Sequence, residues 1–566
     1  MDEIKAEVAR VQKDISDVKI QKREKLQNLD FFVLDNSIRE STVGQLRSHT
    51  LENKIQILEQ VRKVGIKHIT IASFSHMTRV DDDFVKYLKD KGEDFTNFYS
   101  FSEVTEGVKD GRYDTETIPV SLQKNHDLNI PNTFFEMDLA NEDVEWDTKF
   151  TVDDMCQMIY KWMKWTYDNI TKDARILFNF RDLPFCMTVA PDRLLYVVRF
   201  LSKLPVEHRP FALCFEDPFG EYLPEELEAW TASMRRTMTA NGWNDGKILV
   251  HIHQKWDLQT ASQLDCLAGG ADGVWASLCE EGAALGHACS SITMMNLIRL
   301  GNTKVLENYN CVELRNAAKE VTRITTGREP HPKQVLYGER ATDLVFGFLG
   351  IGDFDMAKFF GCEAPNRITT LATTDMIVDR MENLYGKSPH FTEEIAMKMK
   401  EQMLLDVRNG RKEEYNSTAG LALLFDRAGG KLTEKMADAI AQVEVKSSYH
   451  KQLIDEIREE WDKWDKRDKE QNDGRLQFDN FYHGFMQPYF GCYRCVTTKK
   501  AIRALDIDKD NYVDWKEFLV YIKWALRQYP NVEDVDSLMS IVFEKGLMPA
   551  MRDERVKNKA FNRIKY

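Results

Sequence analysis

Phe31-Phe-Val-Leu34 and Lys67-His-Ile-Thr-Ile-Ala72 are the two apolar runs that decide the fold of this chain, because an amphipathic helix separates them. The helix is expected from Glu52 to Val64, where apolar residues recur at helical spacing: Ile55, Ile57, Leu58 and Val61. Each run has the length and composition of a buried strand. A strand, a helix and a second strand in this order form the repeating unit of a parallel α/β fold.

The same alternation continues for about 270 residues. Further apolar runs lie at residues 133–137, 176–180, 212–215, 247–252 and 273–276, and helices are expected between them, at residues 151–169, 193–204 and 224–241 among others. This alternation predicts a parallel (βα)8 barrel of the TIM type over residues 28–302.

The rest of the chain divides into four further segments. Residues 1–27 form an expected amphipathic helix that would dock on the barrel or pair with another chain, with one apolar face made of Ile4, Val8, Val11, Ile15 and Val18. A mostly helical subdomain is expected at residues 303–449, an all-α pair of EF-hands at residues 450–545, and a basic tail at residues 546–566.

The intact calcium loop is Asp506-Ile-Asp-Lys-Asp-Asn-Tyr-Val-Asp-Trp-Lys-Glu517. Loop positions 1, 3, 5, 9 and 12 carry the expected side-chain ligands, and the carbonyl of position 7 completes the set: Asp506, Asp508, Asp510, Asp514, Glu517 and Tyr512. Asn511 replaces the usual Gly at position 6, and Asn is the next best residue for a left-handed backbone. With apolar helices expected on both sides, this loop predicts a bound Ca²⁺.

A damaged partner loop is expected upstream. EF-hands pair through position 8, which is Val513 in the intact loop, and Gly474-Arg-Leu476 matches the equivalent segment of a partner. Counting back from Gly474 puts Lys469 at position 1, whereas a frame that starts at Asp465 or Asp468 needs an inserted loop. Asn480 takes the place of the bidentate Glu, so we expect one working calcium site and one structural loop.

The composition limits the function classes. A formal net charge of −14 argues against a general nucleic-acid binder, and no apolar run reaches the roughly 18 residues of a membrane span. The ten cysteines lack disulfide-scaffold spacing and the chain starts as an acidic helix, so a cytoplasmic or organellar protein is expected. Cys492 and Cys495 form either a redox or metal motif or two packed thiols.

Two polar motifs stand at the expected carboxyl ends of barrel strands. Leu34-Asp-Asn-Ser-Ile-Arg39-Glu40 follows the first strand, and Val250-His251-Ile-His253 ends a late one. Side chains two residues apart in a strand face the same side, so His251 and His253 point together. Two imidazoles with a carboxylate across the barrel mouth can hold a divalent metal, although such a pair also occurs as two polar residues at a barrel rim.

These motifs resemble the DRE-TIM metallolyases, the family of isopropylmalate synthases, homocitrate synthases and hydroxymethylglutaryl-CoA lyase. The segment from Asp35 to Glu40 resembles the family signature Asp-Thr-Thr-Leu-Arg-Asp, and His251-Ile-His253 resembles its metal-binding His-x-His. The resemblance runs on to Tyr337-Gly338-Glu-Arg-Ala341 and excludes the calcium loops. It implies a catalytic arginine and four ligands for Mn²⁺, Zn²⁺ or Mg²⁺: Arg39, then Glu40, His251, His253 and His287.

Several positions depart from the family pattern. Glu40 is one methylene longer than the family's Asp, and His287 stands where an Asn ligand is expected. Thr70 and Leu349 replace a Glu and a catalytic His of related enzymes. The metal ligands are thus largely kept, whereas several groups that handle substrate are lost.

Two functions agree with these motifs. The resemblance implies a metal-dependent acyltransferase or lyase that makes or breaks a C–C bond in a small keto acid or a CoA thioester, and the calcium loop adds the expectation that calcium regulates it. Arg39 would stabilise the enolate oxyanion, and Asp35, Asp217 and Lys255 are alternatives for the base. The alternative is an inactive barrel that serves as a calcium-responsive scaffold, favoured by the lost substrate groups. A homodimer is compatible with the N-terminal helix.

Overall fold

The computed structural model describes residues 2–40, 50–74, 80–105, 107–282, 286–342, 356–362, 367–410, 415–441, 448–469, 474–486, 503–506, 510–529, 532 and 534–547. The chain divides into two compact units, residues 1–342 with 352–364, and residues 343–351 with 365–566. Among the described helices, none is both long enough and apolar enough to cross a membrane.

The first unit is a closed barrel of eight parallel strands, as the sequence predicted. The strands follow chain order around the barrel: β1 (Phe32–Asp35), β2 (His68–Ser73), β3 (Phe98–Glu103), β4 (Asn132–Met137), β5 (Ile176–Phe180), β6 (Ala212–Asp217), β7 (Lys247–Ile252) and β8 (Gly273–Ala276). Inward side chains fill the interior with an apolar core that includes Leu34, Phe101, Phe134, Leu249 and Trp275. Because the interior is packed, a site can form only where the strands end.

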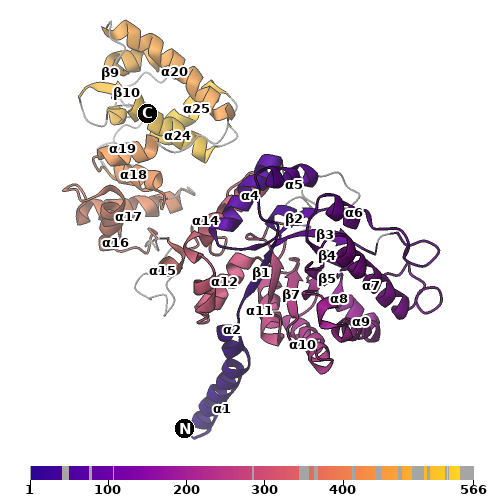
Figure 1. The fold of residues 1–566 in the computed structure, drawn as a ribbon. Helices are drawn as coiled ribbons and strands as arrows, with labels where there is room; N and C mark the ends of the chain where they lie inside the picture. The colour runs from indigo at the N-terminus through magenta and orange to yellow at the C-terminus, as the bar shows by residue number, and fades with distance from the viewer. Residues whose placement is uncertain are drawn as a thin grey trace. The chain divides into compact units, whose positions relative to one another are not determined.

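Helices cover the outside of the barrel (Figure 1). They are α4 (Leu51–Lys63), α5 (Asp81–Asp90), α6 (Val120–Asp127), α7 (Val152–Asn169), α8 (Leu183–Val189), α9 (Pro191–Lys203), α10 (Pro224–Ala240), α11 (Gln259–Gly269), α12 (Ser290–Arg299), α13 (Lys304–Asn308), α14 (Cys311–Thr326) and α15 (Met356–Phe360). The capping boxes Thr50–Asn53 and Thr151–Asp154 fix where α4 and α7 begin.

Strand β3 is the one that hydrophobic patterning missed. Its sequence Phe98-Tyr-Ser-Phe-Ser-Glu103 interrupts the apolar run with two serines. Both serines are buried and hydrogen-bonded: the Ser100 hydroxyl donates to Asn125 Oδ1 at 2.5 Å, and the Ser102 hydroxyl lies 2.9 Å from that of Thr133. A polar residue can occupy a barrel strand when its hydrogen bonds are satisfied by neighbouring elements.

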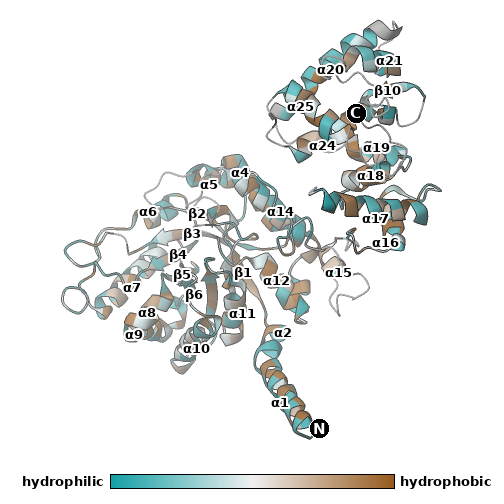
Figure 2. Ribbon diagram, turned by 180° about the vertical axis from the view of Figure 1, so that it is seen from behind, coloured by the Kyte–Doolittle hydropathy of each residue, from teal (hydrophilic) through white to brown (hydrophobic). Residues whose placement is uncertain are grey.

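The N-terminal segment is a continuous helix with two different ends. α1 (Asp2–Val18) has no buried residue, η1 (Lys19–Arg23) is one π-helical turn, and α2 (Glu24–Asn28) reaches the barrel. Lys22 pairs with Glu228 at 2.9 Å and with Asp265 at 3.0 Å, and Leu26 is buried in the core outside the barrel. The carboxyl end of the segment is therefore anchored, whereas the apolar stripe of α1 is exposed (Figure 2).

The second unit contains two hydrophobic cores. The first belongs to α16 (Thr374–Tyr385), α17 (Glu393–Arg408), α18 (Thr418–Arg427) and α19 (Glu434–Ala441). The second belongs to α20 (Ser448–Lys469), β9 (Arg475–Gln477), α21 (Phe478–Asn480), η4 (Phe481–Phe485), η5 (Arg503–Leu505), β10 (Tyr512–Asp514), α24 (Trp515–Gln528), α25 (Val535–Ile541) and η6 (Val542–Leu547). The mostly helical character predicted for this region is confirmed.

Helix α24 contributes to both cores. Phe518 and Ile522 are buried in the core that surrounds β9 and β10, whereas Val520 is buried among α16–α19. The Tyr521 hydroxyl donates to Asp426 Oδ2 at 3.3 Å, and burial raises the pKa of Asp426 to about 6. Helix α24, which follows the loop at residues 506–514, is thus packed directly on the preceding helices.

Candidate metal centre

Stacked aromatic rings form the floor of the barrel mouth. Trp275 stacks on Phe101 at 5.7 Å and on Phe134 at 4.4 Å between ring centroids. Arg39 lies on this floor, with Cζ 4.0 Å from the Phe101 centroid and 4.9 Å from that of Trp275. Contact with two aromatic faces helps to hold the guanidinium in place.

A buried ion pair fixes the turn that carries Arg39. The short helix α3 (Ser37–Glu40) follows β1, and Lys54 from α4 donates to the carbonyl of Ile38 at 2.9 Å. The same ammonium pairs with Asp81 at 2.9 Å, and Asp81 accepts from the backbone N–H of Ser73 at 2.9 Å. Lys54 therefore ties the Arg39 turn to the end of β2.

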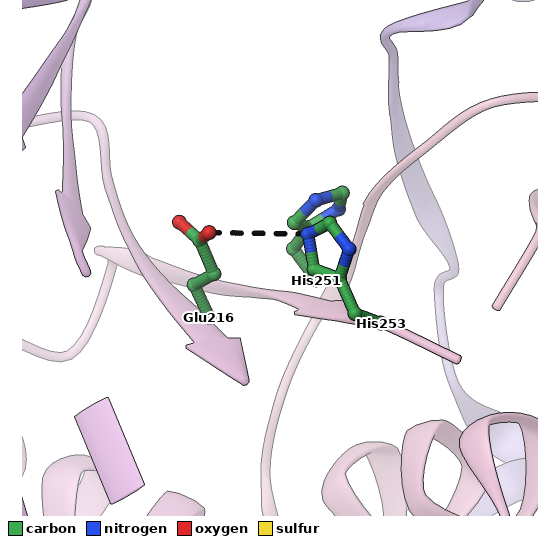
Figure 3. A group of neighbouring side chains, drawn as sticks. All are labelled: Glu216, His251 and His253. Carbon is green, nitrogen blue, oxygen red and sulfur yellow. Dashed lines mark ion pairs between the residues drawn. The ribbon is translucent and has the colours of Figure 1, made fainter. Parts of the chain in front are cut away.

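Glu216, His251 and His253 come together at the ends of β6 and β7. Glu216 lies beside His251 in the strand register, and all three side chains are buried. Their candidate ligand atoms lie within 4.8 Å of one another, and the side chains turn toward a common point (Figure 3). His253 Nε2 is 3.9 Å from Glu216 Oε1.

The orientation of His251 is set by the neighbouring strand. His251 Nδ1 lies 2.7 Å from the Trp275 carbonyl, which only accepts, so Nδ1 carries the proton. In the neutral imidazole, Nε2 then has the lone pair that a metal requires. The Trp275 ring centroid is 4.6 Å from that of His251, so Arg39 and His251 both contact the same indole.

His287 completes a group of three imidazoles. Its ring centroid is 5.2 Å from that of His251 and 6.1 Å from that of His253, and His253 and His287 form a backbone bridge. Its Nε2 lies 3.5 Å from the Ser277 hydroxyl. His287 thus borders the cluster of described ligand atoms rather than joining it.

A second carboxyl group lies on the other side of Glu216. The Asn179 amide donates to Glu216 and, at 3.2 Å, to Glu136 Oε2. Burial, and then the charge of Glu216, raise the pKa of Glu136 to about 7, against the opposing charges of Arg39 and Arg181. Two carboxyl groups that share one amide cannot both ionise easily, so one of them can hold a proton near neutral pH.

The three residues that the sequence offered as bases have other environments. Asp35 accepts from the backbone and hydroxyl of Ser37 at 2.9 and 3.0 Å, and burial raises its pKa to about 7. Asp217 accepts from the backbone of Phe219 and Gly220, and burial raises its pKa to about 6. Lys255 pairs with Glu221 at 2.6 Å on an exposed loop.

The residues predicted for the barrel site are thus placed as follows. Arg39, His251, His253 and His287 converge at the mouth, whereas the side chain of Glu40 and all of Leu349 lie outside the described residues. Sequence reasoning missed Glu136, Asn179 and Glu216 as site residues. A carboxylate or amide inside an apolar strand is the signal that points to them.

The loop at residues 506–517 has the strand pairing that was expected for it. β10 and β9 are antiparallel with Val513 opposite Leu476. Asn511 has a φ of +73°, and Asp514 and Glu517 cap α24 through reciprocal hydrogen bonds of 2.7 and 2.8 Å. Asp508 lies outside the described residues, and so do Cys492, Cys495 and residues 548–566.

Of the two frames considered for the partner loop, the contacts agree with the one that starts at Asp465 and contains an insertion. Asn511 N–H donates to Asp506 Oδ2 at 3.2 Å, and Gly474 N–H donates to Asp465 Oδ2 at 2.7 Å. Asn511 and Gly474 each stand two residues before the paired Val513 and Leu476. The two contacts are therefore equivalent, and Asp465 rather than Lys469 takes position 1.

Comparisons with known proteins give only distant likenesses. No family model and no curated protein matches the chain. Among solved structures, the HMG-CoA lyase of Bacillus subtilis has 14% identity and a TM-score of 0.40, over 53% of this chain and 95% of that one. Hydroxymethylglutaryl-CoA lyase of Pseudomonas aeruginosa has 11% identity and a TM-score of 0.40, over 53% and 94%.

Another solved structure resembles a larger share of this chain. The carboxyl transferase domain of Rhizobium etli pyruvate carboxylase has 9% identity and a TM-score of 0.38, over 92% of this chain and 78% of that one. At such identities and scores these likenesses carry no argument about activity, which rests on the residues of the barrel mouth.

Proposed function

We propose that the barrel binds a divalent metal through Glu216, His251 and His253 and makes or breaks a C–C bond in a keto acid or an acyl-CoA. The observation that carries this proposal is the buried cluster of one carboxylate and two imidazoles. Nitrogen and oxygen donors in this combination suit Zn²⁺ and Mn²⁺, and the proton on Nδ1 leaves His251 ready to ligate. Glu40 and His287 are further candidate ligands.

Each neighbouring residue has a distinct role in this proposal. A bound ion would act as a Lewis acid toward a substrate carbonyl. Arg39, held over Phe101 and Trp275, would donate hydrogen bonds to an enolate oxygen that gains charge. Glu136 would take and return the proton, because its pKa of about 7 matches a base that works at neutral pH. Asn179 orients Glu136 and Glu216.

Metal analysis combined with a turnover assay tests the proposal. The protein is purified without added metal, its metal content is measured, and acyl-CoAs with keto acids are screened for release of free CoA thiol. We expect one barrel ion per chain and turnover that Arg39→Lys and Glu136→Gln each reduce by at least about 100-fold. A barrel mouth that binds no ion in excess Mn²⁺ and Zn²⁺ would favour the alternative, an inactive barrel that serves as a scaffold.

We also propose that the 506–517 loop binds one Ca²⁺. The pairing of Val513 with Leu476 and the positive φ of Asn511 support this assignment. Arg475 of the partner loop pairs with Asp510, one of the expected ligands, so its guanidinium competes with calcium for this carboxylate. Replacing Arg475 by Gln should therefore tighten calcium binding, whereas an unchanged affinity in titration calorimetry would exclude this competition.

A further inference from the structure

The apolar stripe of α1 has the spacing of a coiled coil. Ile4, Val8, Val11, Ile15 and Val18 alternate steps of four and three residues, which is the repeat of heptad positions a and d. All five side chains are exposed, Val11 at 46% and Ile4 at 65%. The stripe ends where η1 adds a π-helical turn and rotates the following residues onto the barrel.

As a single helix, α1 would be only marginally stable in water. Isolated helices of roughly 12–15 residues are marginal in water, and most helical stability comes from packing of an apolar face. α1 buries none of its 17 residues, although α2 fixes its carboxyl end to the barrel. The heptad stripe of this anchored helix has the spacing that a second helix along its length would cover.

We propose that α1 forms a parallel coiled coil between copies of this chain. The charges beside the stripe decide the orientation. Glu7 and Asp14 take heptad position g, and Lys5, Gln12 and Lys19 take position e. In a parallel pair Asp14 meets Lys19 of the second copy and Glu7 meets Gln12. In an antiparallel pair acids would face acids and lysines would face lysines.

A lipid surface is the alternative occupant, and the sequence of α1 opposes it. Helices that lie on membranes combine a basic polar face with Trp, Phe or Leu on the other face. α1 has five acidic residues against three basic ones, and its stripe contains only Val and Ile. β-Branched residues at a and d are those of coiled-coil cores.

Sedimentation velocity of the full chain over a range of concentrations tests whether α1 forms the coiled coil. We expect concentration-dependent association, and Val11→Lys combined with Ile15→Lys should weaken it at least about tenfold, since two charges enter the interface. Ala9→Lys combined with Ser16→Lys is the matched control, because it adds the same charge on the exposed opposite face. A monomeric wild type would overturn the proposal. So would a Val11→Lys/Ile15→Lys variant that associates as tightly as the wild type.

A charge swap tests the orientation. Asp14→Lys should weaken association roughly two- to fivefold, and adding Lys19→Asp should restore it, because the pair meets across the parallel interface. Association of Asp14→Lys as tight as that of the wild type contradicts the parallel arrangement. Binding of monomeric wild type to vesicles of phosphatidylcholine with phosphatidylserine would replace the proposal with a membrane role.

Discussion

Replacing Lys54 by Met should destabilise the barrel by about 3–5 kcal/mol, because it leaves a buried carboxylate without its partner. Lys54 is 1% exposed and Asp81 is 3% exposed, so water cannot replace the lost ammonium. Among the described residues, the backbone N–H of Ser73, at 2.9 Å, is the hydrogen-bond donor that Asp81 keeps. The carbonyl of Ile38 loses its donor as well.

A double variant separates the effect of the unpaired charge from the effect of lost packing. Lys54→Met together with Asp81→Asn should recover most of the loss, since a neutral amide oxygen still accepts from Ser73 and no buried charge remains. Lys164→Met is the matched control, because Lys164 pairs with Asp168 at the surface, where both side chains are more than half exposed. Its effect should stay within about 0.5 kcal/mol.

Pulsed hydrogen exchange across a urea series measures these differences on peptides of β1 and β2, separately from the second unit. If Lys54→Met is no more destabilising than Lys164→Met, the ion pair does not support the barrel. If the double variant is as unstable as the single one, an uncompensated charge is the wrong explanation.

Four further outcomes are expected. His253→Ala should weaken barrel metal binding at least about tenfold in a competition titration and leave calcium binding intact, since the ligands lie in separate units. The rate should fall as pH drops below about 7, where Glu136 becomes protonated, and Glu136→Gln should remove that limb of the pH profile. Glu517→Gln should abolish the calcium isotherm, because position 12 supplies two oxygens. Calcium should raise hydrogen-exchange protection within residues 374–441, which pack on α24, and protection changes confined to residues 448–547 would contradict this coupling.

The barrel was predictable because its strands are nearly continuous apolar runs. The predicted runs at residues 133–137, 176–180 and 247–252 agree with β4, β5 and β7 within one residue at each end. β3 was not predictable from hydropathy, since Ser100 and Ser102 depend on Asn125 and Thr133 of other elements. Local composition does not contain that information.

The site was predictable only where its residues form a local motif. His251 lies on β7 and His253 follows directly after its last residue, so the periodicity of an extended backbone places them together. Glu136, Asn179 and Glu216 come from three strands, and only closure of the barrel brings them together. Their shared hydrogen bonds and the raised pKa of Glu136 are therefore properties of the tertiary structure.

Helix α24 has a consequence for how the second unit folds. One face of it completes the core around β9 and β10 and another face completes the core of α16–α19, so neither core is closed without this helix. A fragment that stopped at residue 441 would expose the apolar surface that covers Val520, and one that started at residue 448 would expose Val520 itself and leave Tyr521 without Asp426. Residues 367–547 should therefore melt in a single cooperative transition, and domain boundaries drawn between residues 441 and 448 should yield aggregating fragments.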